Sequence, residues 1–172
     1  AHRYLHLLET ACLVTRVAPY TPGPLGAQVK SPRWFWTDCG LAAWLAGIRS
    51  REALAARVDR GVWLEQTLFQ SLQGWRAADP DRRTVGFWRD RNGRQVDFVL
   101  EQDGVMVAVE VKETRRAALD DARGIEAFRQ ALGRKGQKVR GVVLHAGPSR
   151  RLGDNLFALS FGWLTPRHDG LP

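Results

Sequence analysis

Hydrophobic and polar residues alternate with a period of two through the middle of this chain, between about residues 84 and 113. Two dipeptides that favour tight hairpin loops, Asn92-Gly93 and Asp103-Gly104, interrupt the alternation. The pattern therefore predicts a three-stranded antiparallel meander over residues 84–90, 95–101 and 105–113.

The second turn predicts which residues of the last two strands face each other. If Asp103-Gly104 forms the loop, Asp97 faces Glu110 and Lys112 lies two residues further along the same face. Facing residues have Cβ atoms roughly 4.5–5.5 Å apart, so the two carboxylates are expected side by side. The other face is expected to be wholly apolar, with these facing pairs: Val96 and Val111, Phe98 and Val109, Leu100 and Val107.

Helical patterns flank the meander. Leucines recur with helical spacing over residues 61–75 and predict a helix with one apolar stripe. A second helix is expected over residues 118–132, with Leu119 on its inner face and Gly124 packed closely against the sheet. Strands are predicted at residues 139–145, with the composition of a doubly buried and often parallel strand, and at 155–161.

The N-terminal third follows a different order. Residues 2–10 have helical spacing, residues 11–19 and 33–37 have the pattern of two strands, and Asp38 caps a helix over residues 40–46. This segment resembles the end of a winged-helix domain, with residues 11–37 as the wing. A wing either binds DNA or packs between domains, and the analogy favours neither use.

Composition narrows the class of partner. The chain has 172 residues and a net charge of +8, which favours a polyanionic partner such as DNA but is also met in ordinary soluble proteins. The two cysteines, Cys12 and Cys39, lack a metal-type spacing and fit a reduced, cytoplasmic protein. No apolar run approaches the roughly 20 residues that span a bilayer, so no membrane association is expected.

The facing carboxylates indicate a chemistry. Like charges directly opposite each other destabilise a sheet, and a divalent cation reverses the repulsion. Asp97 and Glu110, with the Val111 carbonyl as a further ligand, are therefore candidate ligands of Mg²⁺ or Mn²⁺. Lys112 would orient the attacking water or help to deprotonate it, as metal-assisted phosphodiester hydrolysis requires.

Asp97 followed by Glu110-Val111-Lys112 resembles the Asp…Glu-x-Lys motif of the PD-(D/E)xK nuclease-like superfamily, which includes restriction endonucleases. The resemblance implies an α/β, restriction-endonuclease-like core of order α-β-β-β-α-β, with a mixed sheet flanked by helices. It also assigns Glu65 to the catalytic group, since the first helix of the superfamily often presents a Glu toward the metal. Alternatively, Glu65 is a surface residue that stabilises the first turn of its helix.

Longer segments, among them WLEQTLFQSL, FWRDRNGRQVDFVL and VEVKETRR, resemble a family of prokaryotic ATP-binding proteins. Its members carry an AAA-type ATPase, a winged helix and a C-terminal domain of unknown function with a nuclease-like fold. The resemblance implies that an ATPase precedes this chain in a longer protein, although the chain has no Gly-x-x-x-x-Gly-Lys loop of its own. The expected parts are a partial winged-helix segment (1–50), a linker helix (51–60), a nuclease-like domain (61–166) and a tail (167–172).

Basic and aromatic residues surround the predicted site. The candidate phosphate contacts, which could equally be solvated surface residues, are Arg89, Arg91, Arg94, Arg115 and Arg116. Trp88 would stack on an unpaired base or, as we favour, pack beneath a helix. His145 has no evident catalytic partner and is interpreted as structural.

Three functions fit these observations. The first, which we slightly favour, is a Mg²⁺-dependent nuclease acting on DNA. The second is a catalytically inactive nuclease-fold module that binds nucleic acid or a protein beside an AAA-type ATPase. The third, an ordinary solvated sheet face, conflicts with the need to cover Val99 and Ala108 on the same face as the acids.

Overall fold

The computed structural model describes residues 2–21 and 31–164. Its helices are α1 (His2–Thr10), α2 (Cys39–Leu45), α3 (Arg51–Ala55), α4 (Arg60–Ala77) and α5 (Arg123–Leu132). Its strands are β1 (Val14–Val17), β2 (Arg33–Trp36), β3 (Arg83–Arg89), β4 (Gln95–Gln102), β5 (Val105–Val111), β6 (Arg140–His145), β7 (Arg150–Gly153) and β8 (Leu156–Ser160). Three 3₁₀ helices complete the description: η1 (Leu119–Ala122), η2 (Gly133–Lys138) and η3 (Phe161–Leu164).

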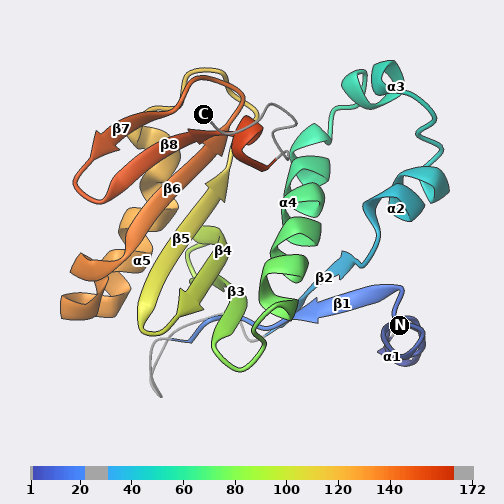
Figure 1. The fold of residues 1–172 in the computed structure, drawn as a ribbon, viewed down its shortest axis with the longest axis horizontal. Coiled ribbons are helices and arrows are strands. Elements are labelled where there is room, and N and C mark those ends of the chain that lie inside the picture. Colours follow the sequence, from blue (N-terminus) through green and yellow to red (C-terminus); the bar gives the residue numbers. More distant parts are fainter. Residues whose placement is uncertain (1, 22–30, 165–172) are drawn as a thin grey trace.

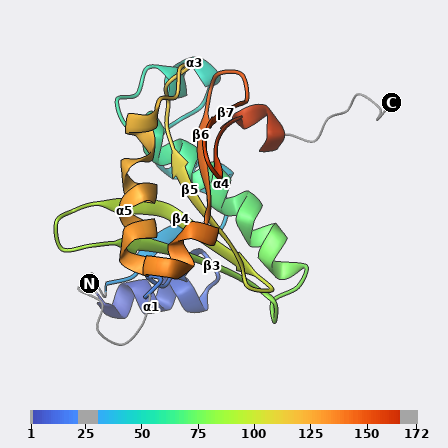
Figure 2. The ribbon, with the colours of Figure 1, turned by 90° about the vertical axis from the view of Figure 1, so that its left-hand side faces the viewer.

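Six strands form one mixed sheet in the order β3-β4-β5-β6-β8-β7 (Figure 1). The pairs β5–β6 and β6–β8 are parallel, and the other three pairs are antiparallel. Helices α4 and α5 cover opposite faces of this sheet (Figure 2). The predicted class, an α/β fold with a mixed sheet between helices, is confirmed.

The predicted meander and the register of its second turn are also confirmed. Phe98 pairs with Val109 and Leu100 with Val107, as counted from the turn. Asp103 and Gly104 adopt positive φ angles of 52° and 76°, which is why this dipeptide type forms two-residue hairpin loops.

A β-bulge in β4 overturns one expectation. Gly86 pairs with Val99 but Trp88 pairs with Val96, so β4 holds one residue more than β3 in this interval. The extra residue reverses the alternation of side chains beyond it. Val96 therefore packs with Val99 under α5 and does not share the apolar face of Phe98.

Each face of the sheet has its own core. The core under α5 includes Trp88, whose ring centroid lies 5.5 Å from that of Phe128, so the predicted packing role of Trp88 is confirmed. The core under α4 includes Phe69, Phe98 and Val109. Because both faces are covered, Asp97 and Glu110 of the meander lie inside the molecule.

The N-terminal hairpin joins the core under α4. Strands β1 and β2 pair antiparallel, and Asp38 caps α2 by accepting a hydrogen bond of 2.6 Å from the Leu41 N–H. Phe35 of β2 stacks on Phe69 of α4 at a centroid distance of 4.3 Å. The hairpin thus packs against the larger sheet, while most of the loop of the proposed wing and the predicted tail lie outside the described residues.

Several predicted boundaries were wrong. The charged stretch 49–60 is helical only over α3 before α4 begins at Arg60, and the helix expected from residue 118 starts as the 3₁₀ turn η1. Leu119 is 63% exposed and does not lie on the inner face. Strand β7 was not predicted, since its first residues, Arg150 and Arg151, lack the apolar pattern of a buried strand. No helix within the described ranges is long and apolar enough to cross a bilayer.

Candidate active site

Asp97 lies at the bulge, where it replaces a backbone acceptor. Its Oδ2 accepts a hydrogen bond of 2.9 Å from the Val111 N–H, beyond the last paired residues of the β4–β5 ladder, Phe98 and Val109. The Gln95 side chain donates to Oδ1 at 3.3 Å. The side chain of Asp97 is only 3% exposed, so the bulge directs a buried carboxylate toward the neighbouring strand β5.

Glu110 is held next to Asp97 from the neighbouring strand. Its side chain is 5% exposed and lies against Gly124 of α5, where an added Cβ would fall 2.2 Å from Oε1. Burial, and then the negative charge of Asp97, raise the pKa of the Glu110 carboxyl to about 8. Asp97 and Glu110 lie next to the paired residues Phe98 and Val109 on neighbouring strands, so their buried side chains interact directly.

Lys112 supplies a positive charge beside this pair. Its Nζ lies 3.3 Å from Glu110 Oε2, and its side chain is partly open to solvent. Burial acts to lower the pKa of Lys112, but the charges of Glu110 and Asp97 outweigh burial and the pKa is raised. Lys112 is therefore a cation at neutral pH that opposes the repulsion between the two acids.

Glu65 approaches the pair from α4. Burial and the charge of Asp97 raise the pKa of Glu65, whereas the guanidinium of Arg33 lowers it. The Arg33 guanidinium forms an ion pair with Glu65 Oε2. The structure thus brings together the four side chains that the sequence analysis selected: Glu65, Asp97, Glu110 and Lys112.

Arg33 was not anticipated from the sequence. It extends from β2, donates a hydrogen bond of 3.4 Å to the Asp97 carbonyl, and lies 3.9 Å from Asp97 Oδ1. Its guanidinium also lies over the Phe35 ring, 5.1 Å from the centroid. An Arg at the start of an aromatic strand is a weak signal, because only the packing of the hairpin on α4 brings it to the acids.

The arginines selected from the sequence lie at the surface. Arg89, Arg91, Arg94, Arg115 and Arg116 are all exposed. Arg94 Nε lies 2.6 Å from Asp90 Oδ2, and Asp90 also accepts the backbone N–H groups of Asn92 and Arg94. Arg94 therefore has a structural role in the β3–β4 turn.

The donor set suits a hard divalent cation. Asp97 and Glu110 present adjacent carboxyl oxygens in a buried site whose acids repel each other. Within residues 2–21 and 31–164, no group of three or more His, Cys, Asp or Glu side chains has the arrangement to hold a metal alone. Mg²⁺ sites commonly use one or two carboxylates and complete the shell with water and substrate phosphate, so the residues fit such an ion.

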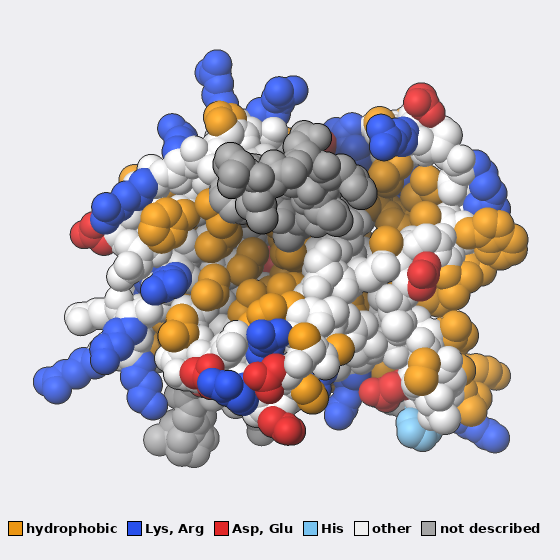
Figure 3. All heavy atoms as spheres, in the orientation of Figure 1, with side chains coloured by type: hydrophobic (Ala, Val, Ile, Leu, Met, Phe, Trp, Pro, Cys, Tyr) orange, Lys and Arg blue, Asp and Glu red, His pale blue; other side chains and the backbone are white. Residues whose placement is uncertain are grey.

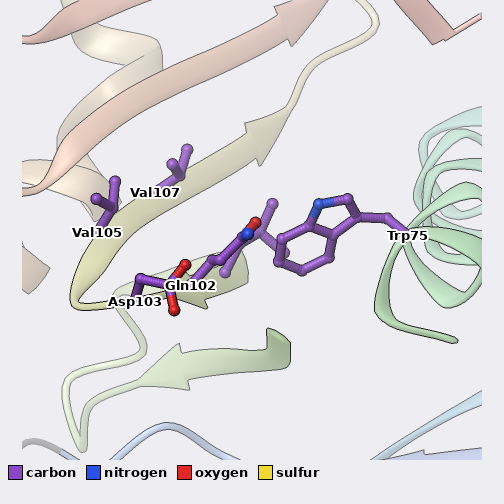
Figure 4. Close-up of a pocket in the computed structure, with 6 residues that line it drawn as sticks. Trp75, Gln102, Asp103, Val105 and Val107 are labelled. Carbon is purple, nitrogen blue, oxygen red and sulfur yellow. The ribbon is translucent and has the colours of Figure 1, made fainter. Parts of the chain in front are cut away.

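The face that carries α4 has basic side chains around its rim and hydrophobic side chains in its middle (Figure 3). A cavity of about 450 Å³ lies there, with Trp75 reaching from α4 toward the turn of the β4–β5 hairpin (Figure 4). Its lining includes Leu100, Val105 and Val107. This apolar cavity is at the other end of the hairpin from Asp97 and is separate from the carboxylates.

The fold and the site define a class: a mixed α/β domain with a buried carboxylate pair and a lysine between the helix-covered faces of its sheet. Residues 60–163 match the family described as a domain of unknown function (DUF4143), which is often found at the C-termini of AAA-type ATPases. That match covers more than half of the chain, and the chain belongs to this family. Residues 1–52 match a second domain of unknown function (DUF8612). No curated protein and no solved structure matches the chain.

Proposed function

We propose that this chain is a PD-(D/E)xK-type nuclease domain that hydrolyses phosphodiester bonds of DNA with Mg²⁺ or Mn²⁺, as part of a longer, ATPase-linked protein. One observation carries the proposal: Asp97, which accepts the Val111 N–H, and Glu110, which lies beside the Lys112 ammonium, are two buried carboxylates on neighbouring strands. The element order α4-β3-β4-β5-α5-β6 supports a restriction-endonuclease-like core.

A purely structural role explains the pair poorly. Burying two acids that repel each other costs stability, and apolar residues of similar size would usually serve a core at least as well. Groups with strongly raised pKa values cluster at functional sites, where a bound ligand or a reaction relieves the repulsion between like charges. The site is therefore better explained by a cation that binds both acids.

Each residue has a role in the proposed reaction. Asp97 and Glu110 hold the metal, with the Val111 carbonyl as a further ligand, and Lys112 positions the attacking water and balances charge on the phosphate. Glu65 supports the metal shell or Lys112 through its negative charge. The bound ion supplies Lewis acidity and lowers the pKa of the attacking water.

Cleavage of duplex, single-stranded and branched DNA with Mg²⁺ or Mn²⁺ tests the proposal. Asp97→Asn should lower the rate by at least about 100-fold, since transition-state electrostatics of this kind contribute several kcal/mol. Asp81→Asn makes the same change at an exposed residue and should cleave like the unmodified chain. The proposal fails if the unmodified chain cleaves none of these substrates, or if Asp97→Asn cleaves equally well.

Arg33 favours a second candidate, a catalytically inactive module that binds nucleic acid or a protein partner. Its guanidinium already pairs with Glu65 and lies 3.9 Å from Asp97, so the cluster contains a cation of its own besides Lys112. Salt-sensitive DNA binding without metal-dependent cleavage would support this function. Absence of DNA affinity at moderate salt would direct attention to a protein partner.

A further inference from the structure

A cavity of about 500 Å³ lies at the carboxyl end of β6. Its lining combines three arginines with one buried histidine and a proline: Arg115, Arg116, Arg150, His145 and Pro148. Strands β5, β6 and β8 run parallel and end on this side of the sheet (Figure 1). Ligands of α/β sheets commonly bind beyond the carboxyl ends of parallel strands.

Close backbone contacts fix the two loops that form the cavity. The Ala146 N–H donates to the Thr114 carbonyl at 3.0 Å, which ties the loop after β6 to the loop after β5. At Gly147 an added Cβ would fall 2.0 Å from the Arg115 carbonyl oxygen, so only glycine permits this approach. The Arg150 guanidinium donates to the Ala117 carbonyl. The cavity is therefore set by the fold.

His145 adds a polar group without a partner. Its side chain is among the most buried in the protein, and Nδ1 accepts a hydrogen bond of 3.2 Å from the Gly147 N–H. That bond assigns the proton of the neutral ring to Nε2. Within the described residues Nε2 is buried and has no hydrogen-bond partner. Since an unpaired buried donor costs about 1–3 kcal/mol, an acceptor brought by a ligand would remove a penalty.

We propose that this cavity binds a phosphate group of a DNA strand. Its polar lining consists of donors, and arginine donors match phosphate oxygens in charge and geometry. Leu144, which precedes His145, pairs with Val111, and its carbonyl accepts the Lys112 N–H at 2.9 Å. A strand whose phosphate occupies the cavity would therefore pass close to Glu110 and Lys112. The identity of the strand as DNA rests on the proposed function; the phosphate chemistry does not.

Binding of a fluorescent single-stranded oligonucleotide, measured by anisotropy in EDTA, tests this proposal without cleavage. The double variant Arg115→Ala/Arg116→Ala should bind about tenfold more weakly, because charge-assisted hydrogen bonds to a phosphate are lost. The slope of log affinity against log salt should become shallower by about 0.7 for each phosphate contact removed.

The control double variant is Arg134→Ala/Lys135→Ala on η2. It removes the same charge from exposed residues that precede β6, at the opposite end of that strand from His145. Its affinity should change less than about threefold, as expected for a loss of long-range attraction alone. Thermal melting of both variants verifies that each is folded.

Comparing oligonucleotides with and without a 5′-phosphate identifies the bound group. If only the phosphorylated strand loses affinity in the Arg115/Arg116 variant, the cavity binds a terminal phosphate. If both strands lose affinity equally, it binds a backbone phosphate; both results support the proposal. Equal affinities of the cavity variant and the control variant would overturn it. Because EDTA prevents metal-dependent cleavage, a failure of the nuclease proposal leaves this result interpretable.

Discussion

Arg33 links the N-terminal hairpin to the carboxylate cluster by charge. Replacing it by methionine removes the partner of Glu65, a largely buried acid whose pKa is already raised by burial. Arg33→Met should therefore lower the free energy of unfolding by about 1–3 kcal/mol, measured by urea denaturation at pH 7. Arg16→Met on the neighbouring strand, at an exposed position, should have little effect.

The double variant Arg33→Met/Glu65→Gln separates pairing from packing. With Glu65 neutral, the loss of Arg33 no longer leaves Glu65 as an unpaired charge, so the double variant should be more stable than the sum of the two single effects predicts. If the change in unfolding free energy of the double variant equals the sum of the changes in the two single variants, the ion pair contributes nothing to stability.

Glu110 should make the free energy of unfolding fall as the pH rises, which is the reverse of the usual effect of an acid in a folded protein. Its pKa is raised from the ordinary 4.5 to about 8, so the folded chain retains a proton that the unfolded chain releases. The contribution is fully present below pH 4.5 and is lost as the pH rises through about 8, by roughly 5 kcal/mol in total. The pKa of Glu65 is raised as well, so Glu65 contributes to the loss of stability in the same direction.

Glu110→Gln keeps the shape of the protonated acid and should remove most of this loss. We expect chemical denaturation in EDTA between pH 5 and pH 8.5 to show a falling stability for the unmodified chain and a nearly flat one for Glu110→Gln. Glu126→Gln, on the exposed face of α5, should retain the fall. A flat profile for the unmodified chain would mean that Glu110 is ionised in the fold.

At the scale of elements, the approach of α5 to the sheet depends on Gly124. An added Cβ would lie 1.8 Å from the Gln95 carbonyl oxygen as well as against Glu110, and neither the backbone nor a buried carboxyl has room to move. Gly124→Ala should therefore destabilise the chain by about 2 kcal/mol or more in thermal or urea unfolding, as overpacking does.

Gly74→Ala in α4 is the matched control. Nothing lies within 4 Å of the added methyl there, so alanine should stabilise the helix by up to about 1 kcal/mol. Opposite signs for the two substitutions are the expected result. A neutral or stabilising Gly124→Ala would show that α5 does not pack closely at this position.

The sequence predicted those elements whose signals are local. Counting from the Asp103-Gly104 turn gave the register that the structure confirms for Phe98 and Val109. Asn92-Gly93 lies in a turn but does not form the expected two-residue loop, since Arg89 pairs with Gln95 and only Gly93 of the dipeptide has a positive φ. Gly124, a poor helix former within a helical pattern, correctly indicated close packing. These features follow from backbone conformation and steric space near the residues themselves.

Features set by distant partners were not predicted. The bulge at Asp97 arises from the pairing of β4 with β3, and alternation counted along one strand cannot reveal it. Arg33 reaches the site only because Phe35 anchors β2 on α4. The short strand β7 forms at a sheet edge, where pairing with β8 requires no apolar pattern.

At the scale of the whole molecule, charge and sheet topology both indicate the same end of the sheet as the place where a polyanion would bind. The chain carries a net charge of +8, and the cavity arginines lie beyond the carboxyl ends of β5 and β6, next to Lys112. A polyanion drawn to these residues would approach the carboxylate pair past Lys112, whose side chain is more exposed than those of Asp97 and Glu110. The N-terminal hairpin contributes a further cation beside the pair, since Arg33 lies 3.9 Å from Asp97 Oδ1.

The central claim is that Asp97 and Glu110 form a single site for a divalent cation. Crystals soaked in Mn²⁺ and measured at a wavelength where manganese scatters anomalously would test it most directly. We predict an anomalous peak in contact with carboxyl oxygens of both residues, and no such peak in Asp97→Asn crystals. A soaked crystal with no peak between the two acids, and with Arg33 and Lys112 still paired to them, would contradict the account.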